Sequence, residues 1–135
     1  MFKFSGSRPQ NLGVKDGKLT PCPGSPNCVC SCYPEDTVHA IEPLSYRSHQ
    51  AAAIAALKQI IRDTDRAEII IESPDYIYAE FSSKLMGYVD DIEFYANPAE
   101  NSIQVRSASR LGKSDLGANR KRIETIRAKL QEIEV

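Results

Sequence analysis

The chain has 135 residues, of which 41% are hydrophobic and 26% are charged, and its formal net charge is −1. This length fits a single domain, the apolar content argues against a disordered chain, and the near-neutral charge supplies no field to attract nucleic acid or an anionic membrane. No apolar run reaches the roughly 18 residues of a membrane-spanning helix, and the first residues lack the apolar stretch of a secretory signal, so we expect a cytoplasmic location.

Residues 1–47 are rich in Gly, Pro, Asn and Ser and show no long periodic segment. A structureless stretch of this length is unusual within a compact domain. We therefore expect an extended arm that wraps the rest of the domain. The sequence CPGSPNC within it predicts a rigid elbow, because two prolines and two turn-forming residues restrict the backbone there.

Two later segments have the apolar spacing of amphipathic helices. The first covers residues 48–64, with Ser48 as its predicted N-cap, and the second covers residues 115–134, with Ser114 or Asp115 as its cap. Their predicted apolar faces consist of Ile54, Leu57, Ile60 and Ile61 in the first helix and of Leu116, Ile123, Ile126, Leu130 and Ile133 in the second.

Four strand-like runs follow one another between residues 67 and 110, joined by short connections that predict an antiparallel meander. The sequence therefore predicts one α+β domain over residues 1–135. A four-stranded antiparallel sheet would carry both helices on one face, and the extended N-terminal arm would wrap around it. The strand residues expected to point at the helices are Ile69, Ile71, Ile77, Phe81, Ile92, Phe94, Ile103 and Val105.

The last hairpin can be registered from its apolar residues. If residues 97–100 form the loop, Phe94 faces Ile103 and Asp91 faces Arg106. All the apolar side chains then lie on one side, and a slip by one residue would move one strand's set to the other side.

The four cysteines, Cys22, Cys28, Cys30 and Cys32, lie close together in the arm, and three interpretations stay open. A metal site would use all four, although their spacing lacks the paired knuckles of structural zinc sites. A Cys22–Cys28 disulfide would close easily across the turn-forming PGSP sequence, but a reducing cytoplasm would keep it open. In the third interpretation the cysteines simply pack against the sheet as small, weakly polar side chains.

Three motifs resemble a known family: NLGVKDGKLTPCPGSPNCV, GYVDDIEFY and IQVRSASRLGKSDLGANRKRIETIR. They occur in the order typical of the domain-of-unknown-function family 1499 of bacterial and plastid proteins, and the resemblance covers nearly the whole chain. The family elbow reads CPxSPNCVSS, which Cys22 and Cys28 match, whereas Cys30 and Cys32 depart from it. The resemblance implies that a four-thiolate site is not a property of the family, and it brings no established reaction.

A polar cluster surrounds the predicted start of the last helix, where unpaired backbone N–H groups and the helix dipole favour a phosphate, sulfate or carboxylate. The alternative is an internal salt-bridge network that fixes this helix to the sheet, with Arg106 held by Asp91 and the N–H groups capped by Ser114 or Asp115. The candidate ligand-binding residues are Arg106, Arg110, Lys113, Ser114, Asp115, Asn119, Arg120, Tyr78 and Asp91.

The sheet face away from the helices would carry tyrosines and charges and is too polar for a buried core, which suits a binding surface. We predict a non-catalytic binding module for a small anionic ligand or a protein partner, and the sequence does not say whether a cofactor is bound. The alternative is a thiol-based redox or metal-binding protein that uses the Cys22–Cys32 loop. Catalysis is disfavoured because the sequence has no phosphate loop or hydrolase motif, although His39 could approach Cys28 or Cys32.

Overall fold

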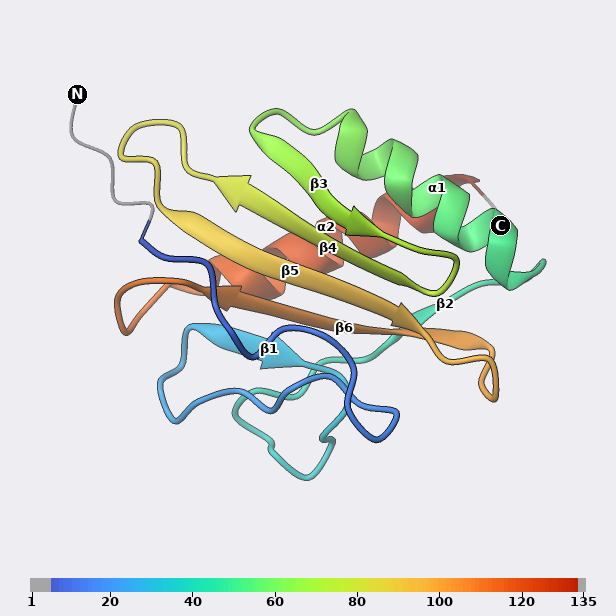
Figure 1. The fold of residues 1–135 in the computed structure, drawn as a ribbon, viewed down its shortest axis with the longest axis horizontal. Coiled ribbons are helices and arrows are strands. Elements are labelled where there is room, and N and C mark those ends of the chain that lie inside the picture. The colour runs from blue at the N-terminus through green and yellow to red at the C-terminus, as the bar shows by residue number, and fades with distance from the viewer. Residues whose placement is uncertain (1–5, 134–135) are drawn as a thin grey trace.

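A computed structural model describes residues 6–133 of the chain (Figure 1). It shows an α+β domain, as the sequence predicts, but the antiparallel sheet has six strands, so the prediction of four strands is wrong. In chain order the elements are β1 (Cys28–Cys30), β2 (Leu44–Ser45), α1 (Gln50–Arg62), β3 (Ala67–Glu72), β4 (Tyr76–Ser82), β5 (Val89–Ala96), β6 (Ser102–Ser109) and α2 (Ala118–Ile133).

The two additional strands come from the predicted arm. The sheet order is β1-β6-β5-β4-β3, and β2 pairs with the start of β6. β1 pairs with the end of β6, where Cys28 lies beside Ala108 and Cys30 lies beside Arg106. Strands of three and two residues are too short to show the alternation by which a strand is recognised in a sequence.

The predicted register of the β5–β6 hairpin is wrong by two residues. Phe94 pairs with Val105, and Ala96, rather than Phe94, pairs with Ile103. A shift by an even number of residues leaves each side chain on its original face of the sheet. Phe94 and Ile103 therefore still belong to the same apolar core, as predicted.

A longer connection explains the shifted register. The Asn97 side-chain oxygen accepts a hydrogen bond from the Ala99 N–H at 2.9 Å, and the Glu100 N–H donates to the Asn97 carbonyl oxygen at 3.0 Å. These bonds close a turn over residues 97–100, but β6 begins only at Ser102. The turn residues were recognised correctly, whereas Asn101, which follows the turn, was wrongly assigned to the strand.

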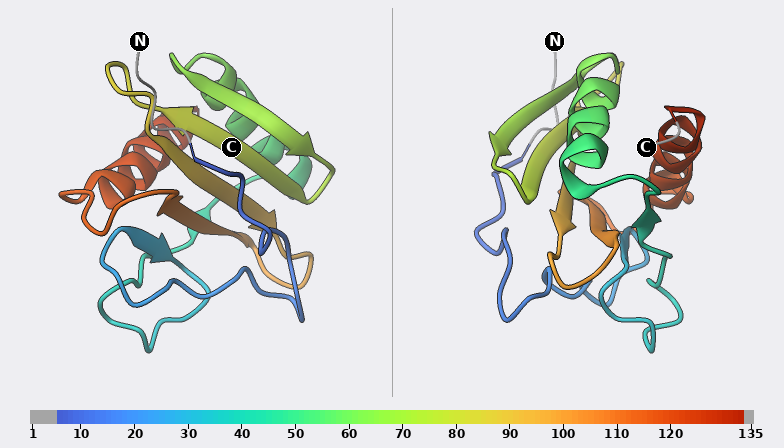
Figure 2. Two further views of the ribbon diagram at one scale, coloured as in Figure 1. Left: turned by 60° about the vertical axis from the view of Figure 1, so that its left-hand side comes forward. Right: turned by 90° about the vertical axis from the view of Figure 1, so that its right-hand side faces the viewer.

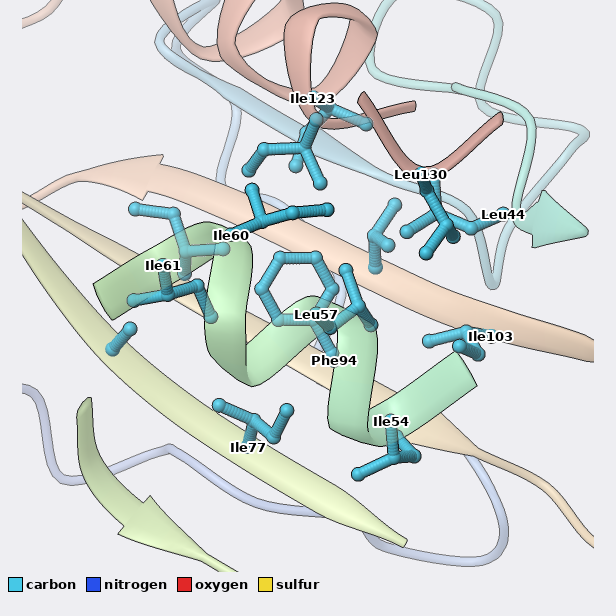
Figure 3. Packing of buried hydrophobic residues seen from close by; sticks show 14 of the residues in the cluster. Leu44, Ile54, Leu57, Ile60, Ile61, Ile77, Phe94, Ile103, Ile123 and Leu130 are labelled. Atoms are coloured by element: carbon cyan, nitrogen blue, oxygen red, sulfur yellow. The ribbon is translucent and has the colours of Figure 1, made fainter. Parts of the chain in front are cut away.

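One apolar core fills the space between the sheet and the two helices (Figure 3). Both helices lie on the side of the sheet opposite to the N-terminal segment (Figure 2). α1 contributes Ile54, Leu57, Ile60 and Ile61, and α2 contributes Ile123, Ile126 and Leu130. Strands β4, β5 and β6 contribute six residues that were predicted to face the helices: Ile77, Phe81, Ile92, Phe94, Ile103 and Val105.

Three residues predicted for the core are exposed instead. Ile71 is 49% exposed, because the β3–β4 pairing shifts between Ile69 and Ile71, which changes the direction of the strand. Leu116 is 98% exposed and lies before the first turn of α2, and Ile133 at its end is 46% exposed. The apolar stripe of the last helix is thus shorter than its sequence pattern indicates.

The helix caps differ in part from the predicted ones. α1 is capped by His49, whose ring nitrogen accepts a hydrogen bond from the Ala52 N–H at 3.3 Å, so the prediction of Ser48 is wrong. Before α2, the Asp115 carboxylate accepts hydrogen bonds from the N–H groups of Gly117 at 2.8 Å and Asn119 at 3.1 Å. Asp115 is therefore the better of the two predicted caps for α2.

We predict that Phe94→Ala lowers the free energy of unfolding by about 3–5 kcal/mol, because it opens a cavity in a fully buried part of the core. Leu116→Ala is the matched control, and it should change the free energy by less than about 0.5 kcal/mol, because Leu116 is exposed. Urea denaturation of both variants measures these values. Equal losses of unfolding free energy in the two variants would contradict the burial of Phe94 or the exposure of Leu116.

Candidate functional site

The polar face of the sheet is covered by the N-terminal segment, which passes in front of the strands in Figure 1. Arg8 donates from its Nε to the Glu80 carboxylate at 2.7 Å, and the Gly13 N–H donates to the Glu93 carboxylate at 2.7 Å. Tyr78 on this face is fully buried. The arm therefore covers part of this face and supplies partners for its polar groups, while the apolar core lies on the other side of the sheet.

Arg106, the first candidate ligand-binding residue, is occupied by the arm. Its guanidinium donates to the carbonyl oxygens of Thr20 at 2.8 Å and Pro21 at 3.4 Å, and only 4% of the residue is exposed. In the observed register Arg106 lies opposite Glu93, not opposite Asp91 as predicted. Its role in the structure is to fix the arm to the sheet.

Arg110 is the centre of a second buried network. Its guanidinium donates to the Asp91 carboxylate at 2.6 Å and to the Glu80 carboxylate at 2.7 Å. The Tyr78 hydroxyl oxygen lies 2.6 Å from the Asp91 carboxylate and 2.9 Å from the Glu80 carboxylate, and its single proton can be donated to either. Hydrogen bonds from Arg8 and then from Arg110 and Tyr78 lower the pKa of Glu80 to about 2.

Glu93 is the least satisfied member of this face. Its Oε2 accepts hydrogen bonds from Gly13 and from the Tyr76 hydroxyl, but its Oε1 has no hydrogen-bond partner among residues 6–133. Glu93 is fully buried, and this desolvation raises the pKa of its carboxyl group. Glu80 and Glu93 thus lie on one sheet face with pKa values moved in opposite directions.

The other candidate residues surround the start of α2, away from the buried network. Asn119 is fully buried and accepts a hydrogen bond from Ser107 at 2.6 Å. Arg120 donates to the Ala40 carbonyl oxygen at 2.8 Å. Lys113 is exposed, while Ser114 and Asp115 line a hollow of about 430 Å³. Because Asp115 already accepts from the first N–H groups, this helix start is capped from within the chain.

A cleft of about 900 Å³ lies beside Arg110, where the N-terminal segment meets the β4–β5 turn. Its positively charged side chains are Arg8, Arg66, Lys84 and Arg110, and its carboxylates are Glu68 and Glu80, so positive charges exceed negative ones by two. We call it the cationic cleft.

Arg66 and Lys84 give the cationic cleft its available charge. Both are exposed, and neither side chain has an ion pair or hydrogen bond within the described part of the chain. The backbone of Arg66 has a φ of 59°, a left-handed conformation that non-glycine residues rarely adopt. Sequence reasoning missed both residues, because each lies in a short turn with no recognisable motif.

The cysteine loop contains one disulfide, between Cys22 and Cys28, with an S–S distance of 2.04 Å. Cys30 is a buried free thiol, and Cys32 is a half-buried one. Two of the four sulfurs are therefore unavailable as thiolates, and no three His, Cys, Asp or Glu side chains of residues 6–133 are grouped to hold a metal ion. The structure follows the disulfide alternative rather than the four-cysteine metal site.

His39 does not pair with a cysteine, as one catalytic alternative would require. Its Nδ1 lies 2.7 Å from the Asp36 carboxylate, and its Nε2 lies 2.9 Å from the Ser25 carbonyl oxygen. Both ring nitrogens are thus engaged in holding the elbow. A thiolate–imidazole pair with Cys28 or Cys32 is not formed.

The chain belongs to the family of proteins of unknown function DUF1499, whose model matches residues 18–130. This match confirms the resemblance of the three motifs. Searches among curated proteins and among solved structures found no match. Neither helix described in residues 6–133 is long and apolar enough to cross a membrane, and the cytoplasmic location stays a prediction.

We predict that Glu80→Gln destabilises the protein by about 1.5–3 kcal/mol near pH 7, because it weakens hydrogen bonds from two arginines to a carboxylate. The folded-state pKa of Glu80 lies below its unfolded value, so its contribution is present above about pH 4.5 and is lost as the pH falls towards 2. Urea denaturation at pH 7 and at pH 2.5 should show the difference between variant and wild type shrinking in acid.

Glu93→Gln provides the opposite pH dependence. The pKa of Glu93 is raised in the folded state, so the wild-type carboxyl group loses stability as the pH rises above about 4.5, and the glutamine variant lacks this loss. The stability of Glu93→Gln relative to wild type should therefore improve between pH 4 and pH 7. If the stability of both variants relative to wild type changed with pH in the same direction, the opposite pKa shifts assigned to Glu80 and Glu93 would be contradicted.

Proposed function

We propose that this member of the DUF1499 family is a non-catalytic binding module whose cationic cleft takes a small organic anion. The observation that carries the proposal is a pair of cations, Arg66 and Lys84, whose side chains have no ion pair or hydrogen bond within residues 6–133, at a cleft of about 900 Å³. A phosphate or carboxylate would give both cations charge-assisted hydrogen bonds. Arg110 is the one sequence-predicted ligand residue in this cleft.

The two other arginines of the cleft, Arg8 and Arg110, are held in place by hydrogen bonds within the chain. Arg8 and Arg110 both donate to Glu80 at 2.7 Å, so one carboxylate holds two guanidinium groups in place. Arg110 also pairs with Asp91 at 2.6 Å, so two carboxylates balance these two guanidinium groups. The positive charge available to a ligand anion therefore comes from Arg66 and Lys84, and only these two side chains would have to order on binding.

The backbone of Arg66 supports a ligand-binding role for this turn. Its carbonyl oxygen accepts a hydrogen bond from the Ser82 N–H at 2.9 Å, which anchors the turn to the end of β4. A left-handed conformation costs a non-glycine residue about 1–2 kcal/mol, and glycine would remove that cost. An arginine at this strained position is consistent with a side chain retained for binding.

The apolar side chains near the cleft favour an organic anion over an inorganic one. Leu85 lines the cleft and is 75% exposed, and Met86 and Tyr88 in the same turn are 37% and 45% exposed. These side chains would contact the apolar part of a ligand whose charged group reaches Arg66 and Lys84. The acidic patch of a protein partner is the other class of anion that the same surface could accept.

Glu80 is poorly suited to act as a general base in the cleft, which supports binding without catalysis. A general base at neutral pH works best with a pKa near 7, whereas the pKa of Glu80 is about 2 and its oxygens are occupied by arginines.

We predict that Arg66→Ala/Lys84→Ala weakens the binding of phenyl phosphate by at least about tenfold, the effect of losing a single interaction worth 1.4 kcal/mol. Lys121→Ala/Lys129→Ala is the matched control, because it removes the same charge from exposed positions on α2. Isothermal titration calorimetry with phenyl phosphate, pyrophosphate and citrate measures the affinities. Equal weakening in both double variants, or no binding of any probe by the wild type at millimolar concentration, would refute the proposal.

A glycine substitution separates binding from folding. Arg66→Gly should weaken phenyl phosphate binding, yet its free energy of unfolding should stay unchanged or rise by up to about 1 kcal/mol, because glycine adopts a positive φ without strain. Urea denaturation and calorimetry on the same preparation test both statements. Wild-type affinity in a stable Arg66→Gly protein would remove Arg66 from the site.

A further inference from the structure

The two free thiols lie at the point where β1 ends and the chain bends. Within β1 the side chain of Val29 belongs to the apolar core, so Cys28 and Cys30 point to the other face of the sheet. The chain then bends at Ser31 and Cys32. With one residue between them, the α-carbons of Cys30 and Cys32 can lie within the roughly 4.4–6.8 Å that a disulfide requires when the chain bends.

Ser31 fixes the geometry between the two thiols. Its N–H donates to the Val105 carbonyl oxygen at 2.9 Å, and its hydroxyl oxygen accepts from the Val105 N–H at 2.8 Å. The same hydroxyl donates to the Gln104 side-chain oxygen at 2.6 Å. Three hydrogen bonds to β6 therefore hold the residue that separates Cys30 from Cys32, while the Cys22–Cys28 disulfide holds the preceding elbow.

The two thiols differ in accessibility. Cys30 is 2% exposed, whereas Cys32 is half-buried and lines an open groove of about 760 Å³. The ionisable side chains of this groove are Lys18 and Arg120 against Asp16, Glu42, Glu100 and Glu124, so negative charges exceed positive ones by two. We call it the thiol groove. It shares no lining residue with the cationic cleft.

The two neighbouring thiols differ in pKa. The Cys30 side chain, the Leu19 N–H and the charge of Lys18 lower the pKa of Cys32 to about 7, and the Cys32 thiol lies 3.8 Å from the Gln104 side-chain oxygen. The Cys32 side chain and burial raise the pKa of Cys30. The accessible Cys32 sulfur is thus the better nucleophile at neutral pH, whereas the buried Cys30 thiol stays protonated.

We propose that Cys32 and Cys30 form a thiol–disulfide exchange centre, in which Cys32 attacks a low-molecular-weight disulfide from the thiol groove and Cys30 resolves the product. The substrate class follows from the groove, whose excess of carboxylates favours a disulfide that carries amino groups.

In the first step, the Cys32 thiolate attacks one sulfur of R–S–S–R, the substrate S–S bond breaks, and RS⁻ leaves and takes a proton from solvent. Cys30 then loses its proton, and its thiolate attacks the Cys32 sulfur and releases the second RS⁻. The pair is oxidised by two electrons to a Cys30–Cys32 disulfide, and the substrate is reduced to two thiols.

Mass spectrometry of the intact protein with cystamine distinguishes the roles of the two cysteines. The wild type should lose the mass of two protons, and peptide mapping should place the new disulfide between Cys30 and Cys32 with Cys22–Cys28 retained. Cys30→Ser should instead accumulate one cysteamine at Cys32, and Cys32→Ser should react at least tenfold more slowly, because Cys30 is buried. A stable mixed disulfide in the wild type, or equal rates for Cys32→Ser and wild type, would overturn the proposal.

Charge preference and pH provide two further readouts. Normalised to a neutral model thiol, rates should fall from cystamine to 2-hydroxyethyl disulfide to the anionic dithiodipropionate, and the cystamine rate should rise with a midpoint near pH 7. The reverse order of rates, or a midpoint near the ordinary cysteine pKa, would contradict the assigned groove or the assigned nucleophile. Because the two sites share no residue, failure here leaves the anion-binding proposal intact, and the reverse also holds.

Discussion

The pairing of Glu80 with two arginines is the interaction on which the arrangement of the N-terminal segment depends. Arg110 reaches Glu80 from the end of β6, and Arg8 reaches it from the arm, each at 2.7 Å. Buried charges are costly unless they are paired and hydrogen-bonded. The sheet can therefore bury Tyr78 and Asp91 only because arginines compensate them, and the arm closes over a polar face rather than an apolar one.

The same pairing determines where an anion could bind. Arg106 and Arg110, the most conspicuous cations of the sequence, are engaged with carbonyl and carboxylate oxygens of the chain itself. The available positive charge lies instead in Arg66 and Lys84, at the edge of the sheet. A strong internal network thus supplies a rigid wall, and two weakly constrained side chains supply the capacity to recognise a ligand.

Strand pairing at the other edge organises the sulfur chemistry. β1 pairs with the end of β6, which buries Cys30 beside Arg106, and the bend that follows brings Cys32 to the surface. The disulfide between Cys22 and Cys28 stabilises the elbow that leads into this strand. The two sites lie on different parts of the same sheet and are held by β6 and its neighbours, so each can be tested without removing the other.

The sequence by itself determined the α+β class, both helices, the four long strands and the family, because periodic apolar spacing over many residues reports directly which side chains must be buried. It also indicated that Cys22 and Cys28 can join, since the turn between them is local. Tertiary structure alone decided the two short strands, the hairpin register and the burial of the polar face, because each depends on partners far away in the chain, such as Arg8 for Glu80 or Val105 for Ser31. The sequence showed where cations lie, but only the fold decided which of them, within the described residues, are engaged by carboxylate and carbonyl oxygens of the chain.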